Sequence, residues 1–69
     1  MSFKDRLIQE RNELRDRCSK LHAFTISDEF WNLEEHVRMW MLEQKKVMNK
    51  YLKILNKRID YINKEITNV

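Results

Sequence analysis

Apolar residues in the first third of the chain recur at alternating steps of four and three residues. This row consists of Phe3, Leu7, Leu14, Leu21 and Phe24, with Glu10 and Arg17 as its polar interruptions. Such spacing is the heptad pattern of a helix that packs along another helix. Ser2 and Asp5 form a capping pattern at its start. The row predicts a helix from about residue 3 to about residue 24.

A second row with the same alternation runs through the second half of the chain. It consists of Val37, Met41, Gln44, Met48, Tyr51, Leu55, Arg58 and Ile62. This row predicts a long helix from about residue 34 to about residue 67.

A connector of residues 25–33 is expected between the two helices. Ser27 or Asp28 is expected to start a short helical turn, and Asn32 is expected to cap the long helix. The large side chains of this stretch are expected to fold back over the end of the core, namely those of Phe30, Trp31 and Leu33.

Folding the chain within this connector places the two rows face to face in antiparallel register. Glu10 then lies near Tyr51 or Leu55, and Arg17 lies near Gln44. The sequence therefore predicts one all-α domain over residues 1–69, an antiparallel helical hairpin.

Self-association of this hairpin into a helical bundle is also expected. A helix of about 23 residues covers roughly 35 Å and one of about 34 covers roughly 50 Å, so the long helix overhangs the short one. Further apolar residues lie on both sides of the second row, and together with it they form an apolar stripe that is too wide for one partner helix to cover. The predicted contacts between copies are Trp40, Ile59, Tyr61, Ile62 and Ile66.

The composition excludes several classes of function. The chain of 69 residues contains no Gly and no Pro, which excludes the Gly-rich loops that cradle phosphates in Walker and Rossmann folds. Cys18 is the only cysteine, so no intrachain disulfide can form. The single cysteine fits a reducing cytoplasm better than an oxidising compartment, so the cytoplasm is the expected location. No apolar run reaches 18 residues, so neither a membrane span nor a membrane partner is expected.

Metal binding and catalysis have little support in the sequence. Cys18 and His22 are four residues apart on one helix face, a spacing that metals use, but neither His36 nor a carboxylate completes a ligand set. No arrangement of a nucleophile with a general base is present. We therefore expect no metal, no cofactor and no enzymatic activity.

The polar residues within the seams have two interpretations. A buried polar pair penalises slipped alignments, so these residues can simply set the register of the helices. Alternatively they form the floor of a polar pocket, in which Arg side chains bind phosphate and Tyr51 stacks on a base. In this second interpretation the ligand-binding residues are Arg17, Gln44, Tyr51, Arg58 and Lys50, and Glu10 orients an Arg or accepts a hydrogen bond from a ribose hydroxyl.

A row of lysines follows the outer face of the long helix. It consists of Lys46, Lys50, Lys53, Lys57 and Lys64. It serves either as a solvated face that keeps the protein soluble or as a surface for phosphate contact. No aromatic residue is interleaved with these lysines, so the usual pattern of bases stacked beside a basic track is missing.

The chain resembles a family of small tailed-phage proteins, the crAss-phage-related short helical proteins. The first half of the resemblance rests on Leu7, Glu10, Glu13, Leu14, Lys20, Leu21, Phe24, Ser27, Phe30 and Leu33, and the second half on Gln44, Met48, Tyr51, Ile54, Leu55, Arg58 and Ile59. Trp40 and Met41 depart from the Leu-Leu usual in that family, and residues 60–69 match no pattern in it. The resemblance implies a phage origin and an accessory role in the infected cell.

In size and plan the chain is also similar to the phage anti-CBASS and anti-Thoeris sponges, which oligomerise and sequester nucleotide messengers. The leading hypothesis is thus a counter-defence protein that sequesters a phosphate-containing signal, such as a cyclic nucleotide or an ADP-ribose-type messenger, in the cytoplasm of the infected bacterium. A second hypothesis is an inhibitor or adaptor that binds a host protein through the apolar end of the long helix. A third is non-specific nucleic-acid binding through the lysine face.

Overall fold

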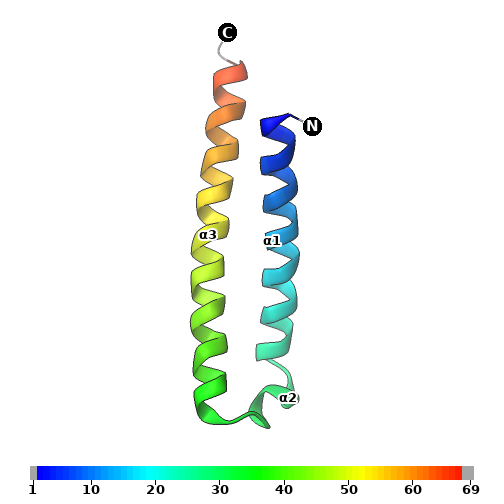
Figure 1. The fold of residues 1–69 in the computed structure, drawn as a ribbon, viewed down its shortest axis with the longest axis vertical. Coiled ribbons are helices and arrows are strands. Elements are labelled where there is room, and N and C mark those ends of the chain that lie inside the picture. The colour runs from blue at the N-terminus through cyan, green and yellow to red at the C-terminus, as the bar shows by residue number, and fades with distance from the viewer. Residues whose placement is uncertain (1, 68–69) are drawn as a thin grey trace.

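The protein is all-helical, as the sequence predicted. The computed structural model describes residues 2–67, with side chains for residues 2–64, and contains the helices α1 (Phe3–Thr25), α2 (Asp28–Trp31) and α3 (Glu35–Thr67). α1 and α3 lie side by side and run in opposite directions, and α2 lies in the connection between them (Figure 1).

Side-chain oxygens at both ends of α1 bond to the backbone of the helix. The Asp5 backbone N–H donates to Ser2 Oγ at 3.1 Å, which is the predicted cap. At the other end Thr25 Oγ1 donates to the His22 carbonyl at 2.8 Å, and Ser27 Oγ donates to the Phe24 carbonyl at 2.6 Å. No described residue has a positive φ angle, so this turn needs no glycine.

The core is a single narrow seam between α1 and α3. Its buried members are Leu7, Leu14 and Cys18 from α1 and Leu55 and Ile59 from α3, with Ile8, Met48, Leu52 and Ile62 packed against them. Leu55 is completely buried, at 0% exposure. The seam therefore includes the predicted residues Leu7, Leu14 and Leu55.

The burial of Ile59 corrects one expectation. Ile59 was expected to stay uncovered within a single chain and to contact another copy, yet it is only 6% exposed against α1. It follows Leu55 by four residues and so lies on the same face of α3. Ile62 is half-buried beside it, and the side chain of Ile66 lies outside the described residues.

Two of the three large connector side chains are at least half-buried, namely Phe30 and Leu33. Phe30 is buried and meets Phe24 edge to face at a centroid distance of 6.4 Å. Trp31 is 68% exposed, which corrects the expectation that it covers the core. Asn32 ends α2 and does not cap α3, because α3 begins only at Glu35.

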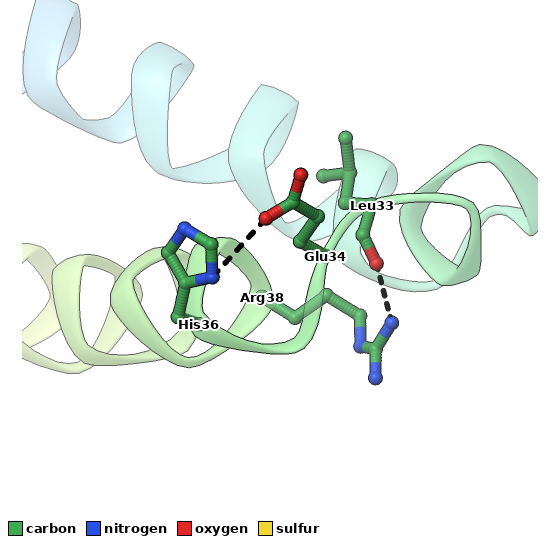
Figure 2. A network of polar contacts seen from close by, with 4 residues as sticks. All are labelled: Leu33, Glu34, His36 and Arg38. Carbon is green, nitrogen blue, oxygen red and sulfur yellow. Dashed lines mark hydrogen bonds and ion pairs between the residues drawn. The ribbon is translucent and has the colours of Figure 1, made fainter.

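Arg38 anchors the connector to the start of α3. Its Nη1 donates to the Leu33 carbonyl at 2.5 Å, and its guanidinium lies 5.3 Å from the centroid of the exposed Trp31 ring. Figure 2 shows Arg38 reaching back to Leu33, while the Glu34 carboxylate lies 3.4 Å from Nδ1 of His36. These contacts hold the turn in place although few of its side chains are buried.

The molecule is elongated and exposes a large surface for its mass. Its backbone extends over 54 × 18 × 15 Å, and α3 extends past the first residues of α1 (Figure 1). The accessible surface is 5703 Å², whereas a compact monomer of 8.6 kDa exposes about 4,700 Å². Among the described residues, no helix combines the length and the apolar character needed to span a membrane.

Shortening Leu55 is expected to destabilise the protein strongly. Leu55→Ala removes a completely buried side chain and leaves a cavity in the seam, at a cost of about 2–5 kcal/mol in the free energy of unfolding. Chemical denaturation followed by circular dichroism, at one fixed protein concentration, measures this change. Leu42→Ala is the matched control, because Leu42 also lies in α3 but is exposed. Equal losses of stability in the two variants would contradict the described seam.

Candidate functional site

The two sides of the seam differ in chemical character. Ile54 and Asn56 are the neighbours of the buried Leu55 and point about 100° to either side of it. Ile54 lies on the same side as Tyr51, and Asn56 lies on the other side. We call one side the Tyr51 flank, where α3 presents Gln44, Tyr51, Arg58 and Tyr61 and α1 presents Phe3, Arg6, Glu10 and Arg17. We call the other side the Asn56 flank, where α3 presents Lys45, Asn49 and Asn56 and α1 presents Arg11, Arg15, Ser19 and His22.

A hydrogen bond between Tyr51 and Glu10 joins the helices on the Tyr51 flank. The Tyr51 hydroxyl donates to the Glu10 carboxylate, so the structure brings this expected pair together. The hydrogen bond to Glu10 raises the pKa of the Tyr51 phenol above its usual value, and partial desolvation and the negative charge of Glu10 act in the same direction. The positive charges of Arg58 and Arg17 act in the opposite direction on that pKa, so both guanidinium groups lie within electrostatic reach of Tyr51.

Arg58 lies against Phe3 at the open end of this flank. Its guanidinium carbon is 5.9 Å from the centre of the Phe3 ring, a cation–π contact. Arg58 and Phe3 together border two shallow grooves. One has a volume of about 340 Å³ and is lined by Phe3, Arg6, Leu7, Glu10 and Arg58, and the other has a volume of about 320 Å³ and is lined by Phe3, Lys57, Arg58, Tyr61 and Ile62.

These grooves combine cationic donors with aromatic surface. Arg6 and Arg58 provide two guanidinium groups, which bind phosphate oxygens in a bidentate manner. Phe3 and Tyr61 provide faces on which a base can stack. The single carboxylate, that of Glu10, already accepts the Tyr51 hydrogen bond. We call the two grooves together the Arg58 site.

The other predicted ligand-binding residues do not gather at the Arg58 site. Gln44 precedes Arg58 by about four helical turns, or about 21 Å along α3, and its amide donates to the Met48 sulfur at 3.7 Å. Arg17 is exposed and has no described hydrogen bond or ion pair. The predicted polar pocket is therefore a long row on one flank, with Arg58 at one end and Gln44 at the other.

Lys50 belongs to a different surface from Arg58. It lines a groove of about 440 Å³ together with Glu43, Lys46, Val47, Asn49 and Lys53, all from α3. Since one helix supplies all of these residues, no second element is present to enclose a ligand there.

Two sets of groove residues were not predicted from the sequence. Phe3 and Arg6 are at helical spacing from Glu10 and so share its face, but Arg6 lies outside the heptad row. The residues of the Asn56 flank likewise follow a helical spacing. Arg15 and Ser19 are four residues apart on α1, and Lys45 and Asn49 are four residues apart on α3. The detectable signal was a row of polar residues beside the seam.

The histidines do not belong to a metal site in the part of the chain that the structure describes. His36 lies beside Glu34 and meets the Trp40 ring edge to face at 5.0 Å. His22 lines a groove with Cys18. No group of three His, Cys, Asp or Glu side chains within the described residues could hold a metal ion.

The Tyr51 phenol is expected to titrate above pH 10.0, its ordinary midpoint. Because the folded pKa is raised, the Tyr51–Glu10 bond contributes its full stabilisation below pH 10 and loses it as the pH rises through the folded pKa. Glu10→Gln should lower the midpoint, since the carboxylate charge is removed. An NMR titration of the Tyr51 ring carbons measures both values, and a midpoint at or below 10.0 in the unmodified protein would contradict the described hydrogen bond.

Comparison with known proteins gives one match. A family model described as Sequestin matches residues 1–61. Searches of curated proteins and of solved structures each found no significant match. The matched segment includes α1, α2 and α3 as far as Tyr61, and so includes the seam and both of its flanks. The match extends over most of the chain, which therefore belongs to the Sequestin family.

Proposed function

We propose that this protein sequesters a phosphate-containing nucleotide signal by binding it without turnover. The family name, Sequestin, points to sequestration and not to catalysis. The observation that carries the proposal is the Arg58 site, where two guanidinium groups and two aromatic rings border adjoining grooves.

A nucleotide fits the chemistry of this site in three parts. Its phosphate lies between Arg6 and Arg58, which supply charged, bidentate donors. Its base stacks on Phe3 or Tyr61, whose rings line the neighbouring groove. Its ribose lies near Glu10, whose second carboxylate oxygen can accept a hydrogen bond from a ribose hydroxyl while the first accepts the Tyr51 hydrogen bond.

The remaining residues of the predicted pocket have smaller parts in this proposal. Arg17 adds positive charge along the flank toward Tyr51, and Lys50 adds long-range attraction from the outer face. Gln44 lies about 21 Å from Arg58 along α3. A ligand bound at the Arg58 site would reach Gln44 only if it extended along the whole flank. The register interpretation of Glu10 and Tyr51 is compatible with this proposal, and the hydrogen bond that joins them across α1 and α3 supports it.

Self-association is part of the proposal, and it uses an apolar stripe along α3. We call it the Trp40 stripe; it consists of Trp40, Val47, Ile54 and Tyr61, which are 67%, 57%, 46% and 63% exposed. The seven-residue spacing of these side chains is the spacing that fits another helix. Burying them against a second copy would remove the excess surface of the elongated monomer.

The Trp40 stripe borders the Tyr51 flank, so a second copy would partly cover the Arg58 site. Tyr61 belongs to both surfaces. In a single copy the grooves are open, and affinity for a small ligand depends on burying most of its surface. A partner copy would supply that enclosure, and Trp40, Tyr61 and Ile62 remain the proposed contacts.

The biological setting we propose is phage counter-defence in the cytoplasm of an infected bacterium. It follows from the resemblance to small helical phage proteins and to phage sponges. Such a protein acts by mass action, so its copy number and its affinity determine how much free signal remains. Release of an intact signal on denaturation distinguishes this mechanism from degradation.

Binding of a host protein is the second candidate function. The observation that favours it is the strong exposure of Trp40 and Tyr61, since large exposed apolar surfaces often mark protein interfaces. Nucleic-acid binding through the outer lysines has weaker support, because a single helix lines that face and no aromatic residue does.

Isothermal titration against a panel of cyclic nucleotides and cyclic ADP-ribose isomers tests the proposed function. We expect at least one ligand to bind and to be recovered unchanged. Arg58→Gln should weaken that binding about ten- to hundredfold, because a charged hydrogen bond to phosphate contributes about 1.5–3 kcal/mol. Lys46→Gln is the control, since it removes one positive charge from the outer face. The absence of heat with every ligand at micromolar protein would contradict the proposal.

Charges placed on the Trp40 stripe should separate the copies. Val47→Glu combined with Ile54→Glu is expected to raise the dissociation constant of the oligomer at least tenfold, which corresponds to about 1.4 kcal/mol. Sedimentation velocity over a range of concentrations measures it. Leu42→Glu is the matched control, because Leu42 is exposed on another face of α3. A monomer at all concentrations of the unmodified protein would overturn the proposed association.

A further inference from the structure

A groove on the Asn56 flank is not part of the proposed function. It has a volume of about 330 Å³ and is lined by Arg15, Cys18, Ser19, His22, Lys45, Asn49 and Leu52. Cys18 and Leu52 form its floor, and both belong to the packed seam. Its walls come from both long helices, α1 and α3, so it differs from the groove on the outer face of α3, which a single helix lines.

The charge of this groove is positive and uncompensated. Arg15 and Lys45 provide two cations, and no carboxylate lines the groove. The hydrogen bond described for Arg15 goes to the neutral Asn12 amide oxygen, at a long 3.4 Å. The ion pairs within the described residues join Lys20 to Asp16 and His36 to Glu34, and none of these four residues lines the groove. A concave surface with charge of one sign concentrates ions of the opposite sign.

Neutral hydrogen-bond donors accompany the two cations. Ser19 follows Arg15 by one helical turn, and Asn49 follows Lys45 by one turn, so each wall presents a cation and a hydroxyl or amide whose backbone positions are about 6 Å apart along the helix axis. The two helices run in opposite directions (Figure 1), so the walls present this order in opposite senses. His22 adds an imidazole one turn beyond Ser19.

From this arrangement we infer that the groove binds a small phosphorylated molecule, whose phosphoryl oxygens lie between Arg15 and Lys45 and receive hydrogen bonds from Ser19 and Asn49. Guanidinium, ammonium, hydroxyl and amide groups are the usual phosphate donors. The volume is at the lower end of the range for ligand pockets. The occupant is therefore a phosphate or diphosphate with at most a small organic group attached.

This second site is independent of the Arg58 site. The two lie on opposite sides of the seam, because Arg58 lines one and Leu52 lines the other, and these residues point to different sides of Leu55. The Trp40 stripe borders the Tyr51 flank, so association through it leaves the Asn56 flank open. The protein would then hold phosphorylated ligands in two places, one at the copy interface and one outside it.

Titration with inorganic pyrophosphate at constant ionic strength, followed by amide NMR, tests this inference on the full chain. We expect saturable shifts at Ser19 and at the Asn49 side chain, and we expect Val47, which lies on the opposite side of α3 and lines neither proposed site, to shift less. Arg15→Gln and Lys45→Gln should each raise the dissociation constant at least tenfold. Lys53→Gln, which removes the same charge from the outer face, should change it less than twofold.

Three results would overturn the inference. Shifts that do not saturate would mean loose attraction of ions only. An equal effect of Lys53→Gln and Lys45→Gln would mean that net charge, not the groove, binds the anion. Much tighter, length-dependent binding of a single-stranded oligonucleotide would mean that the flank contacts a nucleic-acid backbone and not a small molecule. Failure of nucleotides to bind at the Arg58 site would leave the pyrophosphate result unchanged, so the two proposals fail separately.

Discussion

The seam between α1 and α3 is the interaction on which the rest of the structure depends. A pair of helices shares one face, so only a few side chains can be removed from water: Leu7, Leu14, Cys18, Leu55 and Ile59. A core of this size gives limited stability to a chain near the lower limit for an independent domain. The apolar residues that do not fit into the seam are left outside, and they include the large rings of Trp40 and Tyr61. A second copy is the simplest way to cover them.

The same geometry explains why the protein has two different flanks. Residues beside a helix seam point to one side or the other according to their place in the turn. The sequence puts aromatic rings and arginines on one side of Leu55, and amides, Arg15 and Lys45 on the other. The two flanks are the surfaces where side chains of both long helices line the same grooves. Both flanks carry cationic side chains, but only the Tyr51 flank adds aromatic faces beside the Trp40 stripe.

The heptad spacing predicted the helices and the approach of Tyr51 to Glu10 in an antiparallel alignment. The part of Arg58 in ligand binding stays a prediction. The heptad spacing wrongly placed Ile59 at a contact between copies. It gives the centre of the face that two helices share, but not how far that face extends to either side. Trp31 was placed wrongly because its size suggested burial, whereas Phe30 is the buried ring of the connector and packs against Phe24. Phe3, Arg6 and Arg15 were not predicted as groove residues, because a groove depends on two helices together. The resemblance to the crAss-phage-related proteins stays a prediction.

Sequestration requires that the ligand stays bound and stays intact. Native mass spectrometry of the protein as purified from cells measures the number of copies and any retained small molecule in one spectrum. We predict an oligomer that carries a phosphorylated ligand, and the same ligand mass after the protein is denatured. A monomer without ligand, from cells that contain the signal, would contradict the central claim.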